Sequence, residues 1–113
     1  MKKLLVIAVG MLFLASCAQQ NLYTWGKYQE AAYAYTKNNT EKDIEALIKA
    51  YQYIIDNQKS GRKTVPPGIC ADYGFLLIQR GRVNEGLKLM KMEIALYPES
   101  RVFIEGIIKK LEQ

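Results

Sequence analysis

One segment of this chain repeats apolar residues with the period of an α-helix, and it limits the possible fold more than any other feature. Between Thr40 and Gly61 the apolar positions recur every three or four residues, which places them on one helical face. They are Ile44, Leu47, Ile48, Tyr51, Ile54 and Ile55. Thr40 followed by Asp43 is typical of a capping box, so we expect the helix to begin there and to end at Ser60-Gly61.

Four further segments of the 113-residue chain have helical spacing, and none shows the alternation of a convincing strand. They extend over about Thr24–Lys37, Pro67–Arg80 and Asn84–Tyr97, with a last one from about Glu99 onward. The connections between them are short, so consecutive helices should pack as antiparallel hairpins. The sequence therefore predicts an all-α fold of stacked hairpins with a C-terminal capping helix.

The N-terminus has the pattern of an export signal. Met1-Lys2-Lys3 is positively charged, and the apolar run Leu4–Leu14 that follows is about 11 residues long. That is short of the roughly 20 residues that cross a bilayer as a helix, and it suits a removable signal. The alternative interpretation is an uncleaved membrane anchor.

The string that ends this run, Leu14-Ala15-Ser16-Cys17, resembles the bacterial lipobox. The resemblance implies that the signal peptidase recognises Leu14, Ala15 and Ser16, and that Cys17 receives a diacylglycerol and an acyl chain. It also implies an outer-membrane, periplasm-facing location in a Gram-negative-type cell envelope, because Ala18 rather than Asp follows the cysteine. We expect residues 1–16 to be a signal peptide, 17–22 a lipidated tether and 23–113 the folded domain.

Composition argues against catalysis and against nucleic-acid binding. Loss of Lys2 and Lys3 with the signal lowers the formal charge from +5 to +3, too little for a nucleic-acid footprint. The chain has no His, and Cys70 is the only cysteine after Cys17, which leaves no metal-ligand or thiol-base set. We predict no catalytic residue, no metal, no small-molecule substrate and no cofactor beyond the covalent lipid. A glycan-cleaving carboxylate pair such as Asp72 with Glu30 is the alternative.

The stretch from Pro67 to Ser100 is 34 residues long, the period of a tetratricopeptide unit. It resembles that motif at the large and small positions that pack its two helices together, at the glycine of the turn between them and at the terminal proline. These positions are Tyr73, Gly74, Leu77, Gly81, Gly86, Met90 and Pro98. Cys70 stands where the motif usually has Trp, which is a departure from it. The resemblance implies a short tetratricopeptide-like array, and a generic helical bundle is the alternative.

Tyrosines are concentrated in the N-terminal half of the mature chain. Four of them, Tyr28, Tyr33, Tyr35 and Tyr53, are candidate partner-binding residues, because tyrosine offers a large contact area with a polar end. The alternative is that they are core residues with their hydroxyls at the edge.

A second resemblance covers nearly the whole mature chain. Soon after the lipobox come Tyr23-Thr24-Trp25-Gly26-Lys27-Tyr28, then Val65-Pro66-Pro67-Gly68, and near the end Tyr97-Pro98-Glu99-Ser100. This combination resembles the domain-of-unknown-function 4810 family of small bacterial lipoproteins. The resemblance implies that other envelope lipoproteins are partners, one of them similar to the curli-secretion pore lipoprotein.

These features favour a non-catalytic adaptor or scaffold, held at the membrane by its lipid, that binds another envelope protein. Two alternatives stay open. One is a pilotin-like factor for an outer-membrane secretion subunit, and the other is a protein that binds or cleaves the cell wall.

Overall fold

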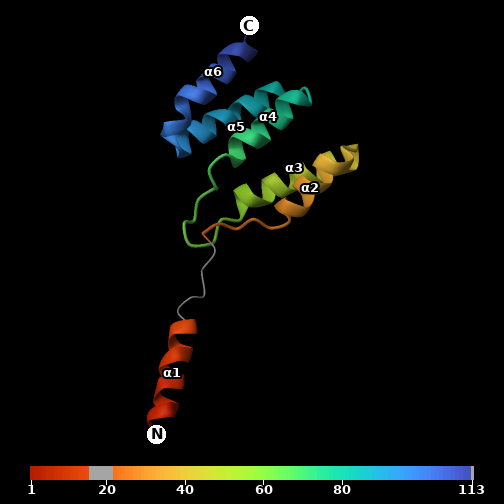
Figure 1. The fold of residues 1–113 in the computed structure, drawn as a ribbon. Coiled ribbons are helices and arrows are strands. Elements are labelled where there is room, and N and C mark those ends of the chain that lie inside the picture. The colour runs from red at the N-terminus through yellow and green to blue at the C-terminus, as the bar shows by residue number, and fades with distance from the viewer. Residues whose placement is uncertain (16–21, 113) are drawn as a thin grey trace.

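The computed structural model describes residues 1–15 and 22–112 of the chain (Figure 1). Within these residues all regular structure is helical, which confirms the predicted fold class. The elements are α1 (Lys2–Ala15), α2 (Tyr28–Asn38), α3 (Glu41–Asp56), α4 (Ile69–Gln79), α5 (Val83–Leu96), the short 3₁₀ helix η1 (Pro98–Ser100) and α6 (Arg101–Leu111).

The helix α1 contains most of the predicted export signal, and the apolar side chains at its start are exposed to solvent. Ser16 and Cys17 lie outside the described residues, and of Leu14 and Ala15 only the backbone is described. Among the described helices, none combines the length and the hydrophobicity that a bilayer crossing requires.

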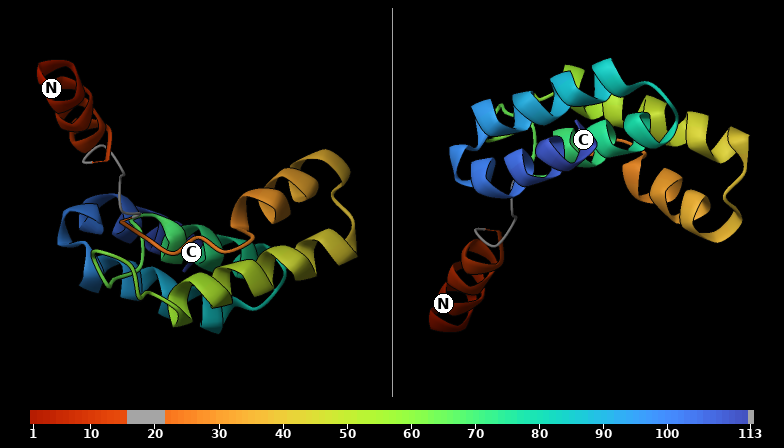
Figure 2. Two further views of the ribbon diagram at one scale, coloured as in Figure 1. Left: turned by 90° about the horizontal axis from the view of Figure 1, so that it is seen from below. Right: turned by 90° about the horizontal axis from the view of Figure 1, so that it is seen from above.

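The remaining helices form successive hairpins in chain order. Helix α2 packs against α3, α4 packs closely against α5, and α3 also contacts α4 (Figures 1 and 2). Helix α6 packs on α5 and lies at the end of the stack away from α2 (Figure 1). The predicted stacking of hairpins with a terminal helix is confirmed.

Helix α2 begins at Tyr28, four residues later than the sequence suggested. The cause is Gly26, whose φ of +55° is a left-handed conformation that interrupts a helix. A Cβ atom on Gly26 would lie 2.6 Å from Cδ1 of Tyr53, so this turn is pressed against α3. Trp25, which is part of the predicted helical segment Thr24–Lys37, instead precedes the helix and accepts a backbone hydrogen bond from Tyr28 through its carbonyl oxygen.

Helix α3 begins with the predicted capping box: the Thr40 hydroxyl accepts the Asp43 amide N–H, and the Asp43 carboxylate accepts that of Thr40. It ends at Asp56 rather than at Ser60-Gly61. The Asn57 side-chain amide donates to the Tyr53 carbonyl, and that of Gln58 donates to the Ile54 carbonyl. These amides satisfy the last carbonyls that a longer helix would have used.

Helices α4 and α5 meet at two glycines. A Cβ atom on Gly74 would lie 2.6 Å from the carbonyl oxygen of Gly86, so neither position has room for a side chain. The turn between the helices is closed at Gly81, with φ +85°, where the Arg82 amide bonds to the Leu77 carbonyl and the Gly81 amide to that of Ile78. This is a Schellman ending, as the glycine predicted.

Helix α4 begins at Ile69, two residues later than expected, because Gly68 has a φ of +92°. The Gly68 amide N–H donates to a carboxylate oxygen of Glu93 on α5. Glu93 is only 2% exposed, and its other carboxylate oxygen has no hydrogen-bond partner among the described residues. Glu93 thus accepts one of the amide groups that have no partner within the helix at the start of α4.

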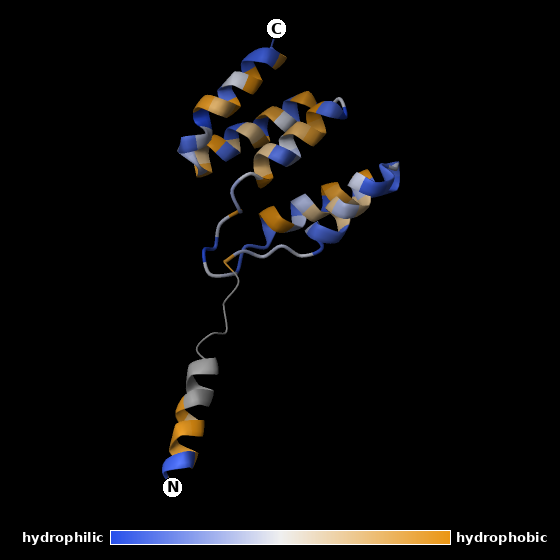
Figure 3. Cartoon of the chain, in the orientation of Figure 1, coloured by the Kyte–Doolittle hydropathy of each residue, from blue (hydrophilic) through white to orange (hydrophobic). Residues whose placement is uncertain are grey.

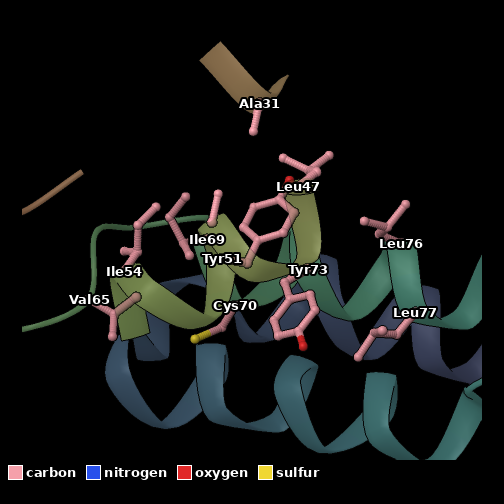
Figure 4. Packing of buried hydrophobic residues seen from close by; sticks show 11 residues of the cluster. Ala31, Leu47, Tyr51, Ile54, Val65, Ile69, Cys70, Tyr73, Leu76 and Leu77 are labelled. Atoms are coloured by element: carbon pink, nitrogen blue, oxygen red, sulfur yellow. The ribbon is translucent and has the colours of Figure 1, made fainter. Parts of the chain in front are cut away.

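The core has two parts. The larger lies between α2, α3 and α4, and Figure 4 shows its side chains, with the rings of Tyr51 and Tyr73 facing one another. The smaller joins α5 to α6 through Met90, Ile94 and Ile104. Of the predicted repeat positions, Tyr73, Leu77 and Met90 are buried. Pro98 is the first residue of η1, so it follows the end of α5 as predicted.

Candidate functional site

A groove of about 720 Å³ lies between the start of α2 and the outer side of α3. Three alanines, Ala31, Ala46 and Ala50, and the backbone of Gly26 contribute its small, apolar surface. Tyr53 is the one aromatic side chain that lines it. Because methyl groups project so little, a ligand in this groove approaches both helix backbones closely.

Gly26 and Tyr53, which both line the groove, pack against each other. Tyr53 leaves the buried stripe of α3 and is 47% exposed, with its ring against the Gly26 turn. The turn itself is tied to the far end of α3. The Thr24 amide N–H donates to Oε1 of Gln58, and Nε2 of Gln58 donates to the Thr24 carbonyl. These two hydrogen bonds hold the chain before α2 in place along α3.

Three charged residues also line the groove: Lys27, Glu30 and Lys49. All three are exposed, and none forms an ion pair among the residues that the structure describes. Their charges are therefore available to a bound partner, and two lysines against one glutamate make the lining net positive.

The four tyrosines predicted to bind a partner do not share one surface. Tyr53 lines the groove, whereas Tyr28 and Tyr35 are half-buried and pack against the main core. Tyr33 is 68% exposed, and Nζ of Lys37 lies 5.9 Å from its ring centroid. The structure thus brings only Tyr53 to the groove.

Tyr28 belongs to a column of aromatic rings that runs through the molecule. Ring centroids are 6.1 Å apart for Tyr23 and Trp25, and 5.7 Å for Trp25 and Tyr28. They are 5.4 Å apart for Tyr28 and Tyr51, and 5.2 Å for Tyr51 and Tyr73, which are stacked at 19°. Burial, and then the neighbouring Tyr28, raise the pKa of Tyr51 far above its ordinary value, so its phenol stays neutral. The column joins the first hairpin to the second.

The alanines of the groove were not among the predicted site residues. Ala46 and Ala50 stand four residues apart on α3, and a smooth helical surface could have been predicted from that spacing. Ala31 on α2 completes the apolar part of the lining. We found no equivalent sequence signal for the contact between Gly26 and Tyr53.

Two buried ionisable groups outside the groove, Glu93 and Cys70, have raised pKa values. Burial raises the pKa of the Glu93 carboxyl, with Asp72 and Glu99 adding to the effect and the Gly68 N–H opposing it. Cys70 is fully buried, and burial with the nearby Glu93 raises its thiol pKa to about 11. The Tyr97 hydroxyl donates to the Val65 carbonyl oxygen at 2.5 Å. In the described part of the chain no group of three or more Cys, Asp or Glu residues is placed to hold a metal ion.

The fold and the groove together define a small, all-helical protein built from stacked hairpins, with an apolar groove on its first hairpin. The chain belongs to the family called Domain of unknown function (DUF4810), whose model matches residues 22–107. The match extends over α2 to α5 and most of α6. Comparisons with curated proteins and with solved structures gave no match.

Proposed function

We propose that this protein is a non-catalytic adaptor that binds an apolar helix of another envelope protein in the groove between α2 and α3. The observation that carries the proposal is the lining of that groove: three alanines and a glycine, one exposed tyrosine and unpaired charges. Helices that lie in grooves are bound by this combination of a smooth apolar surface and a polar edge. The lysines Lys27 and Lys49 favour a helix with carboxylates beside its apolar face.

The proposal includes a lipid anchor. Cys17 carries a diacylglycerol and an acyl chain, residues 1–16 are removed, and the domain faces the periplasm from the outer membrane. The lipobox-like string Leu14–Cys17 supports this. The partner we propose is another lipoprotein of the envelope, such as one similar to the curli-secretion pore lipoprotein.

We further propose that α4 and α5 form a tetratricopeptide-like unit. The close approach of Gly74 and Gly86 supports it, as do the buried Tyr73, Leu77 and Met90 beside that crossing. In such arrays each unit buries its faces against its neighbours, and α6 then acts as the cap.

The groove is tested by filling it. Ala46→Trp places a large ring in the groove from an exposed position on α3, and Glu45→Trp is the matched control, also exposed on α3 but outside the lining. The full-length protein, expressed at its native level, is purified from solubilised membranes and its partners are identified by mass spectrometry. We expect the partner to be recovered with the unaltered chain and with Glu45→Trp, and to be lost with Ala46→Trp. Recovery of this chain alone, or equal binding by both variants, contradicts the proposal.

Two further measurements test the pilotin alternative and the lipid anchor. Deletion of the gene should leave the partner in its membrane, whereas loss of a pilotin would mislocalise it. The mass of the N-terminal peptide reports the anchor directly. An unmodified Cys17 thiol with the leader still attached contradicts the lipid anchor, without bearing on the groove.

A further inference from the structure

The outer face of α6 carries the two most exposed large apolar side chains of residues 22–112. Val102 is 87% exposed and Phe103 is 73% exposed. The opposite face of the same helix packs on α5 through the buried Ile104 and the half-buried Ile107 and Ile108. Figure 3 shows hydrophobic segments on the α6 ribbon, at the end of the stack. Helix α6 therefore carries large apolar side chains on two opposite faces, and among the described residues only one of these faces is covered.

Gly106 lies between Val102 and Phe103 on this outer face when the residues are placed at 100° intervals. A glycine inside a helix costs about 1 kcal/mol relative to alanine. The two other glycines inside helices of residues 22–112, Gly74 and Gly86, are required because their backbones touch. A Cβ atom on Gly106 would meet nothing within 4 Å. Within the described chain, then, nothing requires a glycine at position 106.

We propose that the outer face of α6 is a homodimer interface, in which α6 crosses α6 of a second copy with Gly106 against Gly106. The crossing repeats the glycine-to-glycine contact that the chain already uses between α4 and α5. It covers Val102 and Phe103, and it gives Gly106 the close backbone neighbour that the monomer lacks.

The spacing of charges around Gly106 selects an antiparallel dimer. Phe103 is three residues before the glycine and Lys109 is three after it, and Val102 and Lys110 are likewise four before and four after. An antiparallel two-fold axis through Gly106 places each apolar side chain against a lysine of the other copy. The aliphatic part of a lysine covers apolar surface, and its ammonium group is attracted to the face of a phenylalanine ring. A parallel pair would bring four lysines together.

This interface is distinct from the groove, which lies on α2 and α3 at the other end of the stack. A dimer built on α6 leaves both grooves open to partners, so the two proposals succeed or fail independently.

Disulfide trapping in the full-length protein tests the proposal and its geometry. A disulfide requires Cα atoms about 4.4–6.8 Å apart, which a glycine-to-glycine crossing provides. Gly106→Cys should form a covalent dimer on mild oxidation of intact membranes, seen on non-reducing gels. Phe103→Cys alone should form no covalent dimer, because the antiparallel crossing places the two copies of position 103 on opposite sides of Gly106. Phe103→Cys coexpressed with Lys109→Cys should form one. The unaltered chain is the background control, since Cys70 is fully buried.

A measurement of non-covalent dimerisation does not depend on an added cysteine. Phe103→Lys should weaken dimerisation by roughly 30-fold or more, because a central aromatic contact is lost and a like charge faces Lys109 of the other copy. Gln79→Lys, exposed on α4, adds the same charge away from α6 and should leave dimerisation unchanged. No Gly106→Cys dimer above background overturns the proposal. A disulfide-linked Phe103→Cys homodimer also overturns the proposal. The same holds if lipid or a different protein covers the Gly106→Cys thiol and prevents its oxidation.

Discussion

The carbonyl oxygen of Gly86 lies 2.6 Å from the point that a Cβ atom on Gly74 would occupy. The two helices α4 and α5 thus touch backbone to backbone, and the side chains of Ile78, Leu89 and Met90 lie beside that contact.

Gly74→Ala should destabilise the protein. The added methyl group meets a backbone oxygen, which moves only if the helices separate, and such overpacking costs about 1–3 kcal/mol. For a domain of this size each kcal/mol lowers Tm by roughly 4–8 °C. Thermal unfolding followed by circular dichroism measures the change. Ala95→Ser, exposed on α5, is the control and should unfold at the temperature of the unaltered chain. An unchanged Tm for Gly74→Ala would show that the helices have room at this crossing.

Tyr51 and Tyr73 should be energetically coupled. Their stacked rings join α3 to α4, and aromatic pairs of this kind contribute about 0.5–1.5 kcal/mol beyond burial. A double-mutant cycle with Tyr51→Leu and Tyr73→Leu, measured by denaturant unfolding, gives the coupling free energy. The same cycle with Tyr33→Leu in place of Tyr51→Leu should give a value near zero, because Tyr33 is exposed. Equal coupling in both cycles would contradict a direct ring contact.

Glu93 should make the folded protein less stable as pH rises. Burial raises the pKa of its carboxyl in the folded state, so the folded chain binds this proton more tightly than the unfolded chain does. The free energy of unfolding then falls as pH increases from the ordinary Glu value of 4.5 up through the folded pKa. Glu93→Gln keeps an oxygen for the Gly68 N–H and removes the titration. The Tm of Glu93→Gln minus that of the unaltered chain should therefore increase over that pH range. A Tm difference that stays constant with pH would contradict the raised pKa of Glu93.

Cys70 should resist thiol reagents in the native state. Its thiol is fully buried, and with a pKa of about 11 only about one thiol in a thousand is ionised at pH 8. The reaction rate with a maleimide should match the rate of unfolding, and it should rise sharply in denaturant. Ala95→Cys, exposed on α5, provides a reactive control on the same fold. Equally rapid labelling of Cys70 would mean that the core around it opens readily.

Local signals in the sequence predicted much of this fold. The capping box at Thr40 and the glycine turn at Gly81 depend on residues only a few positions apart, and both are confirmed. The start of α2 and the end of α3 were predicted with errors of four residues, because contacts between distant residues decide them. Gly26 takes its left-handed conformation against Tyr53, and Gln58 ends its helix while bonding to Thr24.

The same limit applies to the candidate site. Tyrosine chemistry predicted four binding residues, but residue type alone does not distinguish a ring in the core from one at a surface. Tyr28 is packed between Trp25 and Tyr51, while Tyr53 is held outside by the Gly26 turn. The groove itself depends on alanines, whose small side chains leave space. A small side chain gives little signal in one sequence.

The aromatic column has an optical consequence. Trp25 is the only tryptophan of the chain, and it stands near one end of a line of tyrosines that reaches from the segment before α2 into α4. Light absorbed by those tyrosines passes to the indole only while the rings stay close. Among the rings of this column only Tyr73 belongs to the second hairpin, so the part of the Trp25 emission that Tyr73 excites reports whether the two hairpins are docked, and no dye needs to be attached.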